Sequence, residues 1–219
     1  MATSGTSNFN PNFDDLLQDA VGMVGGGPIL AEELTAAQRG IDYLLTQIQN
    51  KNILLHKVET TIVAVSTSSV TLNNTIIDVH TVQIRDDNDI ETSMWRLGFE
   101  NWASLTSKGQ TGKPSQYWFD RRLASGILNV WPVPNAEYEL IITVQKTAED
   151  TIRAYNNVDV PRRFLPALLY GLAYWIGLRR MNRVPTDRLQ MLKMEYEQQL
   201  RDAMREDRER ASTFIKLGR

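Results

Sequence analysis

The spacing of apolar residues changes twice along the chain, and this change limits the folds that the chain can adopt. Before residue 51 and after Pro161, apolar residues recur every three or four positions, which predicts helices over residues 13–23, 31–50, 163–181 and 186–212. Between these stretches, short β-branched runs alternate with turn residues, which predicts a sheet of about five strands. The strands should be antiparallel because their connections are short.

The expected fold is therefore α+β. We expect a helical bundle built from N- and C-terminal helix pairs, with an inserted antiparallel β-rich element and a long C-terminal helix. The apolar stripe of that last helix ends at Ala203, and a helix without such a stripe must project into solvent or meet a charged partner. The predicted parts are a polar N-terminal arm (residues 1–12), the bundle (13–56 and 160–204), the β-rich insertion (57–150) and a projecting helix end with a tail (205–219).

The composition is that of an ordinary globular protein. Of its 219 residues, 42% are hydrophobic and 23% are charged, which is enough for one good core, or one core with an appended element. The formal net charge of -2 excludes a global basic field that would attract nucleic acid. The chain has no cysteine, which excludes disulfides, thiolate metal sites and cysteine nucleophiles.

The longest apolar run, residues 164–178, predicts a buried helix rather than a membrane span. A helix of this length covers about 23 Å, whereas the hydrocarbon core of a bilayer is about 30 Å thick. The first residues show neither the basic region nor the apolar segment of a signal peptide. We therefore expect no contact with a membrane.

No motif for catalysis or metal binding stands out. His56 and His80 are the two histidines, and neither has a second histidine at ligand spacing. The acidic run at residues 87–91 is spaced like the start of a calcium-binding loop, but Thr92 and Gly98 stand where such a loop needs Gly and Glu. The sequence predicts no catalytic residue, no metal site and no cofactor, and hence a protein that is not an enzyme.

A stretch rich in aromatic residues, residues 116–142, is open to two interpretations. Platforms that bind sugars, nucleotides or single-stranded nucleic acids place exposed aromatic side chains beside basic ones. Strand alternation places Leu128 and Val130 on one face and Trp131 on the other, so both faces carry apolar groups. The favoured interpretation is a core hairpin made rigid by the prolines at residues 132–134.

Three short motifs follow one another between residues 109 and 180: "GKPSQYWFD", "GILNVWPVPNAEYELIITVQK" and "NNVDVPRRFLPALLYGLAYWIGL". The first fits a G-x-P-x-x-Y/W strand, the second contains a strand that ends in a W-P-x-P turn, and in the third a V-P pair opens an apolar helix. In this order and spacing they resemble the head-to-tail adaptor (head-completion or connector) proteins of tailed bacteriophages. The helices at either end of the chain fit that family in arrangement only.

The resemblance implies a structural role in the virion. Adaptors of this kind form a ring, usually of twelve copies, beneath the portal at the capsid vertex. They continue the DNA channel and offer a surface to the tail. The expected partners are therefore the portal protein, the nozzle or tail-tube proteins and further copies of this chain, while double-stranded DNA passes through the channel without specific binding. The expected localisation is the capsid–tail junction of the virion, after synthesis in the host cytoplasm.

Two groups of residues are candidates for binding these partners. Arg121 and Arg122 lie in a connection within the aromatic stretch and are expected to meet the tail or a neighbouring subunit, although a phosphate backbone is the other option. The last helix and its tail carry basic and apolar side chains that could dock on the portal: Arg205, Arg208, Arg210, Phe214, Ile215 and Leu217.

The alternative function is a nucleic-acid-binding module that uses the C-terminal helix. Residues 179–219 contain 11 Lys and Arg against 7 Asp and Glu, a modest basic excess. The two signs are interspersed, which favours a solvated or protein-facing helix over a phosphate-binding one.

Overall fold

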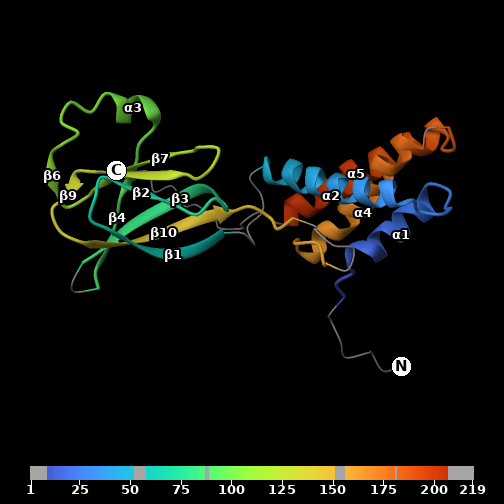
Figure 1. Cartoon of the computed structure of the whole chain (residues 1–219), viewed down its shortest axis with the longest axis horizontal. Coiled ribbons are helices and arrows are strands. Elements are labelled where there is room, and N and C mark those ends of the chain that lie inside the picture. Colours follow the sequence, from blue (N-terminus) through green and yellow to red (C-terminus); the bar gives the residue numbers. More distant parts are fainter. Residues whose placement is uncertain (1–8, 52–57, 87–88, 151–155, 181, 207–219) are drawn as a thin grey trace, which may run out of the picture. The chain divides into compact units, whose positions relative to one another are not determined.

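The structure, a computed structural model, describes residues 9–51, 58–86, 89–150, 156–180 and 182–206. Across these residues the fold is α+β, with five α-helices and three mostly antiparallel sheets (Figure 1). The chain divides into two compact units, each with its own hydrophobic core. We call residues 1–55 with 148–219 the helical unit and residues 56–147 the strand unit.

The helical unit contains α1 (Phe13–Met23), α2 (Ala31–Gln49), the short 3-10 helix η2 (Arg162–Phe164), α4 (Leu165–Arg179) and α5 (Thr186–Glu206). The first helix begins where the sequence predicts, at a capping box. The Asn12 side chain accepts a hydrogen bond from the Asp15 backbone N–H at 2.9 Å, and the Asp15 carboxylate accepts one from the Asn12 N–H at 3.3 Å. These bonds satisfy two N–H groups that the helix itself leaves without partners.

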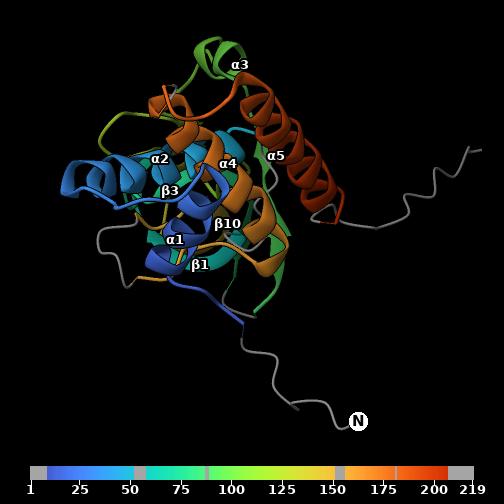
Figure 2. The same ribbon diagram turned by 90° about the vertical axis from the view of Figure 1, so that its right-hand side faces the viewer.

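Helix α4 is the centre of this unit. Its apolar run buries residues on every side of the helix: Leu165, Ala167, Leu168, Gly171, Leu172, Ala173, Ile176 and Gly177. Helices α1, α2 and α5 each pack against it, and Figure 2 shows α4 between α1 and α5. Burial on all sides is what an apolar helix without a polar face requires.

The predicted bundle of two helix pairs is wrong. Helices α1 and α2 both pack on α4, whereas no contact of similar extent joins α1 to α2 within the part of the chain that the structure describes. The physical reason is the composition of α4, which needs cover from several helices rather than from one partner. Apolar spacing predicts that a helix face is buried, but it does not predict which helix covers it.

The connection between α1 and α2 is held by one buried cation. Gly25, Gly26 and Gly27 all have positive φ angles, of 97°, 69° and 100°, which glycine adopts without steric cost. The Arg180 guanidinium donates hydrogen bonds to the Gly26 carbonyl at 2.9 Å and to the Pro28 carbonyl at 3.2 Å. The glycine-rich loop is therefore fixed against the end of α4.

The strand unit is a sandwich of two sheets with a small third one. Its elements are β1 (Val58–Val65), β2 (Ser69–Thr71), β3 (Ile76–Arg85), β4 (Glu91–Ser93), β5 (Trp95–Arg96), α3 (Phe99–Ala103), β6 (Thr111–Gly112), β7 (Gln116–Asp120), β8 (Ile127–Trp131), β9 (Val133–Pro134) and β10 (Tyr138–Lys146). The strand orders are β1-β10-β3-β4, β2-β8-β7-β5 and β6-β9. Alternate residues of the two larger sheets share one core, which includes Val82, Leu128 and Ile142.

Two sequence predictions for this unit are wrong. The expected single antiparallel sheet of about five strands is divided into three sheets, and the pairs β5–β7 and β6–β9 are parallel. The strands on either side of residues 132–134 were expected to form a hairpin, but β8 pairs with β2 and β7, whereas β10 pairs with β1 and β3. The proline segment therefore carries the chain from one sheet to the other.

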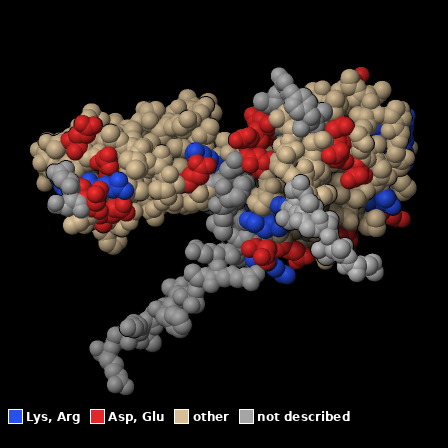
Figure 3. All heavy atoms as spheres, turned by 90° about the horizontal axis from the view of Figure 1, so that it is seen from below, with Lys and Arg blue, Asp and Glu red and all other residues tan. Residues whose placement is uncertain are grey.

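Charged side chains are spread over the surface with both signs close together. Figure 3 shows this for one face of the molecule, where acidic groups on the strand unit (left in the view) gather around basic ones and most of the remaining surface is uncharged. Among the helices that the structure describes, none combines the length and the apolar character needed to cross a bilayer.

Candidate functional site

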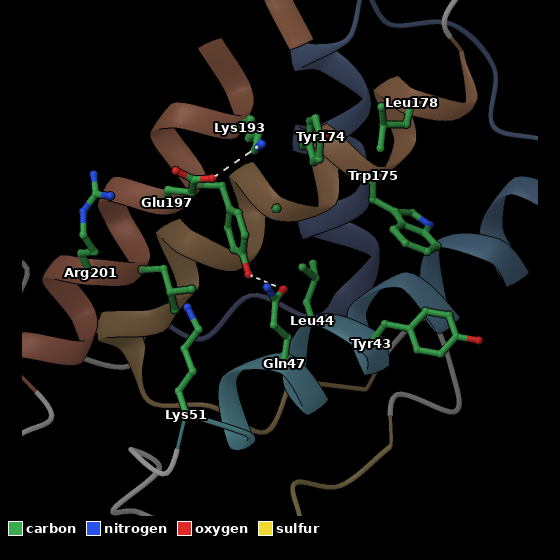
Figure 4. A pocket seen from close by; sticks show the side chains of 13 residues that line it. Tyr43, Leu44, Gln47, Lys51, Tyr174, Trp175, Leu178, Lys193, Glu197 and Arg201 are labelled. Carbon is green, nitrogen blue, oxygen red and sulfur yellow. Dashed lines mark hydrogen bonds and ion pairs between the residues drawn. The ribbon is translucent and has the colours of Figure 1, made fainter. Parts of the chain in front are cut away.

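The candidate site is a groove in the helical unit, between α2, α4 and α5 (Figure 4). Its volume is about 600 Å³. Residues from all three helices line it: Tyr43, Leu44, Gln47, Lys51, Gly171, Tyr174, Trp175, Leu178, Lys193, Tyr196, Glu197, Leu200 and Arg201. In Figure 4 the labelled charged side chains lie toward one end of the groove and Tyr43 and Trp175 lie toward the other.

The aromatic end of the groove depends on a glycine in α2, Gly40. A Cβ atom at Gly40 would lie 2.7 Å from the Trp175 indole, so only glycine lets the indole rest directly on α2. The Tyr43 ring packs at 5.7 Å from the indole in a tilted arrangement, and the Arg179 guanidinium lies 5.3 Å from it on α4. Tyr43 is nevertheless 60% exposed, so this end presents an apolar surface that the helical unit itself does not cover.

The Trp175 indole N–H also lacks an acceptor. Its nitrogen is buried, and it donates no hydrogen bond to any residue that the structure describes. A buried donor without a partner costs about 1–3 kcal/mol. The aromatic end is therefore set by packing against Gly40 rather than by hydrogen bonding.

The charged end has more cations than carboxylates. Lys193 and Glu197 form a loose ion pair at 3.9 Å. Lys51 and Arg201 have no ion-pair partner among the residues that the structure places, although the sequence suggests Glu197 for Arg201. An apolar floor beside two unpaired cations can accept an apolar side chain that carries carboxylates next to it.

One buried hydrogen bond holds the floor of the groove in place. The Tyr196 hydroxyl on α5 donates to the Gln47 side-chain oxygen on α2 at 2.9 Å. Burial raises the pKa of Tyr196, with a smaller contribution from the neighbouring Glu197 carboxylate. The hydroxyl therefore stays protonated and the bond between the two helices persists over the neutral pH range.

Arg121 and Arg122 both have partners inside the strand unit. Arg121 forms an ion pair with Asp78 at 2.5 Å, and Arg122 forms one with Asp120 at 2.7 Å. Their side chains remain 61% exposed, so further contacts are open to them. Binding to the tail or to a neighbouring subunit therefore stays a prediction for these two residues.

Asp78 on β3 links this strand to Arg96 on β5 and to Arg121 in the connection between β7 and β8. Arg96 donates to its carboxylate at 2.8 Å, as does the Val79 backbone N–H. Burial raises the pKa of Asp78, but the hydrogen bonds from Arg96 and Val79 and the charge of Arg121 outweigh it, so the pKa lies below its usual range. Asp78 is therefore ionised at neutral pH and fixes the backbone near Arg121.

The aromatic stretch divides between a core and a surface cluster. Tyr117 and Phe119 are buried between the sheets. Trp118, between them in sequence, faces outward and packs against Phe99 and Trp102 of α3, with ring centroids 5.8 and 5.7 Å away. The sequence favoured burial of the aromatic stretch in a core, but it missed this cluster because Phe99 and Trp102 lie 16 or more positions before Trp118 and no local pattern joins them.

The other residues singled out by the sequence are not brought together. Arg205 lies on α5 and pairs with Asp202 at 3.6 Å. His80 is exposed on β3, and its carbonyl accepts a hydrogen bond from the Tyr117 hydroxyl at 3.1 Å. The residues that fall outside those described are His56, most of the N-terminal arm and five of the six candidate portal contacts, namely Arg208, Arg210, Phe214, Ile215 and Leu217.

The acidic run near residue 89 does not form a metal site within the described chain. No group of three or more His, Asp or Glu side chains with suitable geometry occurs there or elsewhere in the placed residues. Instead, Arg85 pairs with two of its described carboxylates, Glu91 at 3.0 Å and Asp89 at 4.0 Å.

Comparisons with known proteins did not assign this chain to a family. No protein-family model matches the sequence, and a search of curated proteins found no significant match.

Proposed function

We propose that this chain is a structural virion protein, a ring-forming adaptor that joins the portal to the tail and continues the DNA channel. The observation that supports it best is that both units leave large apolar side chains uncovered. In the helical unit these are Tyr43 and the groove around it, and in the strand unit they are Trp95 and Phe99, which are 77% and 66% exposed. Around the groove such side chains form one surface, and contiguous exposed apolar surface is typical of a subunit that is covered on assembly.

The three motifs behind the proposal lie in the scaffold of both units. The first two form β7 to β10 and supply Tyr117, Leu128 and Ile142 to the strand core. The third forms η2 and α4, the centre of the helical unit. The resemblance therefore concerns how the two units are built, and the role in the virion rests on analogy at that level.

The same proposal assigns partners to two segments of this chain. The end of α5 with the residues after it, from Arg205 to Leu217, would meet the portal, and the connection with Arg121 and Arg122 would meet the tail or a neighbouring copy. The protein would act without cofactor or catalysis at the capsid–tail junction, with double-stranded DNA passing through the ring.

The proposal is tested by the mass of the purified protein, alone and mixed with purified portal rings. Light scattering and negative-stain electron microscopy should show a ring of this protein on one end of the portal. A monodisperse monomer under both conditions would count decisively against the adaptor.

The portal contact is tested by removing residues 211–219. The shortened chain should keep the circular dichroism and thermal unfolding of the full chain, because the deletion leaves all described elements in place. It should fail to bind portal rings in co-sedimentation. Attachment at the level of the full-length chain would show that the apolar tag around Phe214 is not the portal-binding segment.

The nucleic-acid alternative finds little support in α5. Its described part, Thr186–Glu206, carries five carboxylates and four Lys or Arg side chains, so the basic excess of the C-terminal region does not lie on this helix. A salt-dependent gel shift with double-stranded DNA at sub-micromolar protein would favour the alternative over the adaptor.

A further inference from the structure

One edge of the strand unit is long and unpaired. Strand β1 has eight residues and lies at the edge of its sheet, with β10 as its neighbour (Figure 1). All of β1 pairs with β10 in an unbroken antiparallel register. Alternate residues of β1 therefore direct their backbone N–H and C=O groups away from the sheet, and no residue that the structure describes bonds to them. This edge is open to a further strand.

The other edges of the strand unit are short or covered. Strands β2 and β4 have three residues each, and β5, β6 and β9 have two. Strand β3 extends beyond β4, but its Val79 and His80 carbonyls accept hydrogen bonds from the Arg96 and Tyr117 side chains. Short or covered edges are how proteins limit unwanted strand pairing. Among the described strands, β1 is thus the one long edge without this protection.

The residues of β1 favour the addition of a strand. Six of its eight residues are β-branched, none is Pro or Gly, and Glu59 is its only charged residue. The Lys146 ammonium pairs with Glu59 at 2.6 Å, so that charge is compensated within the sheet. Ile62 is 54% exposed, and it faces away from the core because Val63, the next residue, packs against the core. A regular strand of this kind is a template for pairing with another chain.

Among the described edges, only β1 of a second copy matches β1 in length. Residues that lie opposite each other in an antiparallel pair point their backbone groups the same way, so in self-pairing one residue must face its own copy on the two-fold axis. A register centred on Ile62 places Glu59 opposite Val65. It covers two exposed isoleucines with one another and keeps the two carboxylates apart. A register centred on Thr61 would place Ile62 opposite Thr60 instead.

We infer that two copies of this chain pair through β1, antiparallel and centred on Ile62. The contact joins two four-stranded sheets into one continuous sheet and covers the open edge of both copies. It is isologous, because the same residues lie on both sides. A two-fold contact cannot repeat around the single axis of a ring, so this pairing belongs to the free protein and goes beyond the proposed function.

The first test is disulfide trapping in the full-length protein, which has no cysteine of its own. Oxidation of Ile62→Cys should link most chains into dimers, because opposite Cα atoms lie about 4.5–5.5 Å apart and a disulfide spans about 4.4–6.8 Å. Thr81→Cys is the matched control. Thr81 is also exposed and on the same face, but it lies on β3, inside the sheet. It should give less dimer by about fivefold or more.

A mixture of two variants tests the register. The inferred pairing places Thr60 of one copy opposite Ala64 of the other, so Thr60→Cys mixed with Ala64→Cys should give a cross-linked dimer. Either variant alone should give as little dimer as Thr81→Cys, because its two thiols would lie about 13 Å apart along the strands. Equal cross-linking of Thr60→Cys alone and of the mixture would overturn the register.

The second test introduces like charges at the two-fold axis. Ile62→Lys places two ammonium groups opposite each other and should raise the dissociation constant of the dimer about tenfold or more, measured by light scattering across a dilution series. Thr81→Lys should leave that constant unchanged. Circular dichroism of both variants checks that they are folded. An equally stable dimer of Ile62→Lys would overturn the pairing.

The outcomes separate this inference from the proposed function. Failure of Ile62→Cys to cross-link, while rings still form on the portal, would overturn the pairing and leave the adaptor in place. A dimer through β1 that forms no ring on the portal would overturn the adaptor and leave the pairing. Portal rings that protect the β1 amides from hydrogen exchange, without any cross-linked dimer of the free chain, would assign this edge to another protein and overturn the pairing.

Discussion

Arg180 is a buried cation in the helical unit, and it joins the end of α4 to two earlier segments. Its guanidinium donates two hydrogen bonds to Glu33, at 2.8 Å and 2.7 Å, and one each to the Gly26 and Pro28 carbonyls. The Arg180 side chain is 7% exposed, and that of Glu33 is 31% exposed. A planar guanidinium meets four acceptors here that a lysine ammonium could not reach together.

Replacing Arg180 by methionine should lower the free energy of unfolding by about 3 kcal/mol, because it removes the guanidinium donors from the Glu33 carboxylate and from the Gly26 and Pro28 carbonyls. Arg180→Lys should recover less than half of that loss. Urea unfolding followed by far-ultraviolet circular dichroism measures both. Equal stability of the parent and the methionine variant would show that the pair contributes little.

The same pair predicts how stability depends on pH. The hydrogen bond from Arg180 lowers the pKa of Glu33 from its usual 4.5, against the opposing effect of burial, so its contribution to stability is present above that value and is lost as the pH falls through the lower folded-state value. Glu33→Gln should be less stable than the parent at pH 7, and the difference should shrink steadily below about pH 4.5. Urea titrations at pH 7 and pH 3 compare the two proteins. A difference that grows in acid would contradict this assignment.

At the scale of elements, the contact between α2 and α4 depends on Gly40. Gly40→Ala adds a methyl group 2.7 Å from the Trp175 indole and should force the ring off α2, lowering the free energy of unfolding by about 1–2 kcal/mol despite the higher helix propensity of alanine. Gly22→Ala in α1 is the matched control, because a Cβ atom there meets nothing within 4 Å. It should leave stability unchanged or raise it by up to about 1 kcal/mol. The same loss in both variants would rule out the close contact as the cause.

Local structure was predictable from the sequence where the pattern was long and regular. The helix at residues 13–23 has the predicted bounds, and the long strands at 58–65, 76–85 and 138–146 lie where β-branched residues alternate. Strands β5, β6 and β9 have two residues each, too few to show a period. The pairing of β8 and β10 with different sheets was not predictable, because both strands bury alternate residues in the same core and local pattern cannot assign them to a layer.

The candidate site was less predictable than the fold. Tyr43, Trp175 and Arg201 are far apart in sequence, and each lies on a helix whose spacing alone indicates a buried or solvated position. The groove arises only when three helices meet. Arg121 and Arg122 stood out in the sequence, but Asp78, which positions Arg121, lies 43 positions earlier and carries no local signal.

At the scale of the whole molecule, two units with separate cores predict two separable unfolding events. Leu128 in the strand unit and Leu168 in the helical unit are both fully buried. Each Leu→Ala change should cost about 2–5 kcal/mol, but only in its own unit. Native-state hydrogen exchange resolved by residue measures the two units independently. If either variant lowered protection equally in both units, the two would have to unfold as one.

The order of the elements along the chain also bears on how the protein is made. The helical unit is interrupted in sequence by the whole strand unit, and α4, which covers the apolar faces of α1 and α2, is translated after it. On the ribosome, the apolar faces of α1 and α2 stay uncovered while the 115 residues between α2 and α4 (50–164) are synthesised, whereas the strand unit is continuous and can close its core first. The nascent protein is thus most exposed to aggregation, and most dependent on chaperones, between the synthesis of Gln49 and that of Arg179.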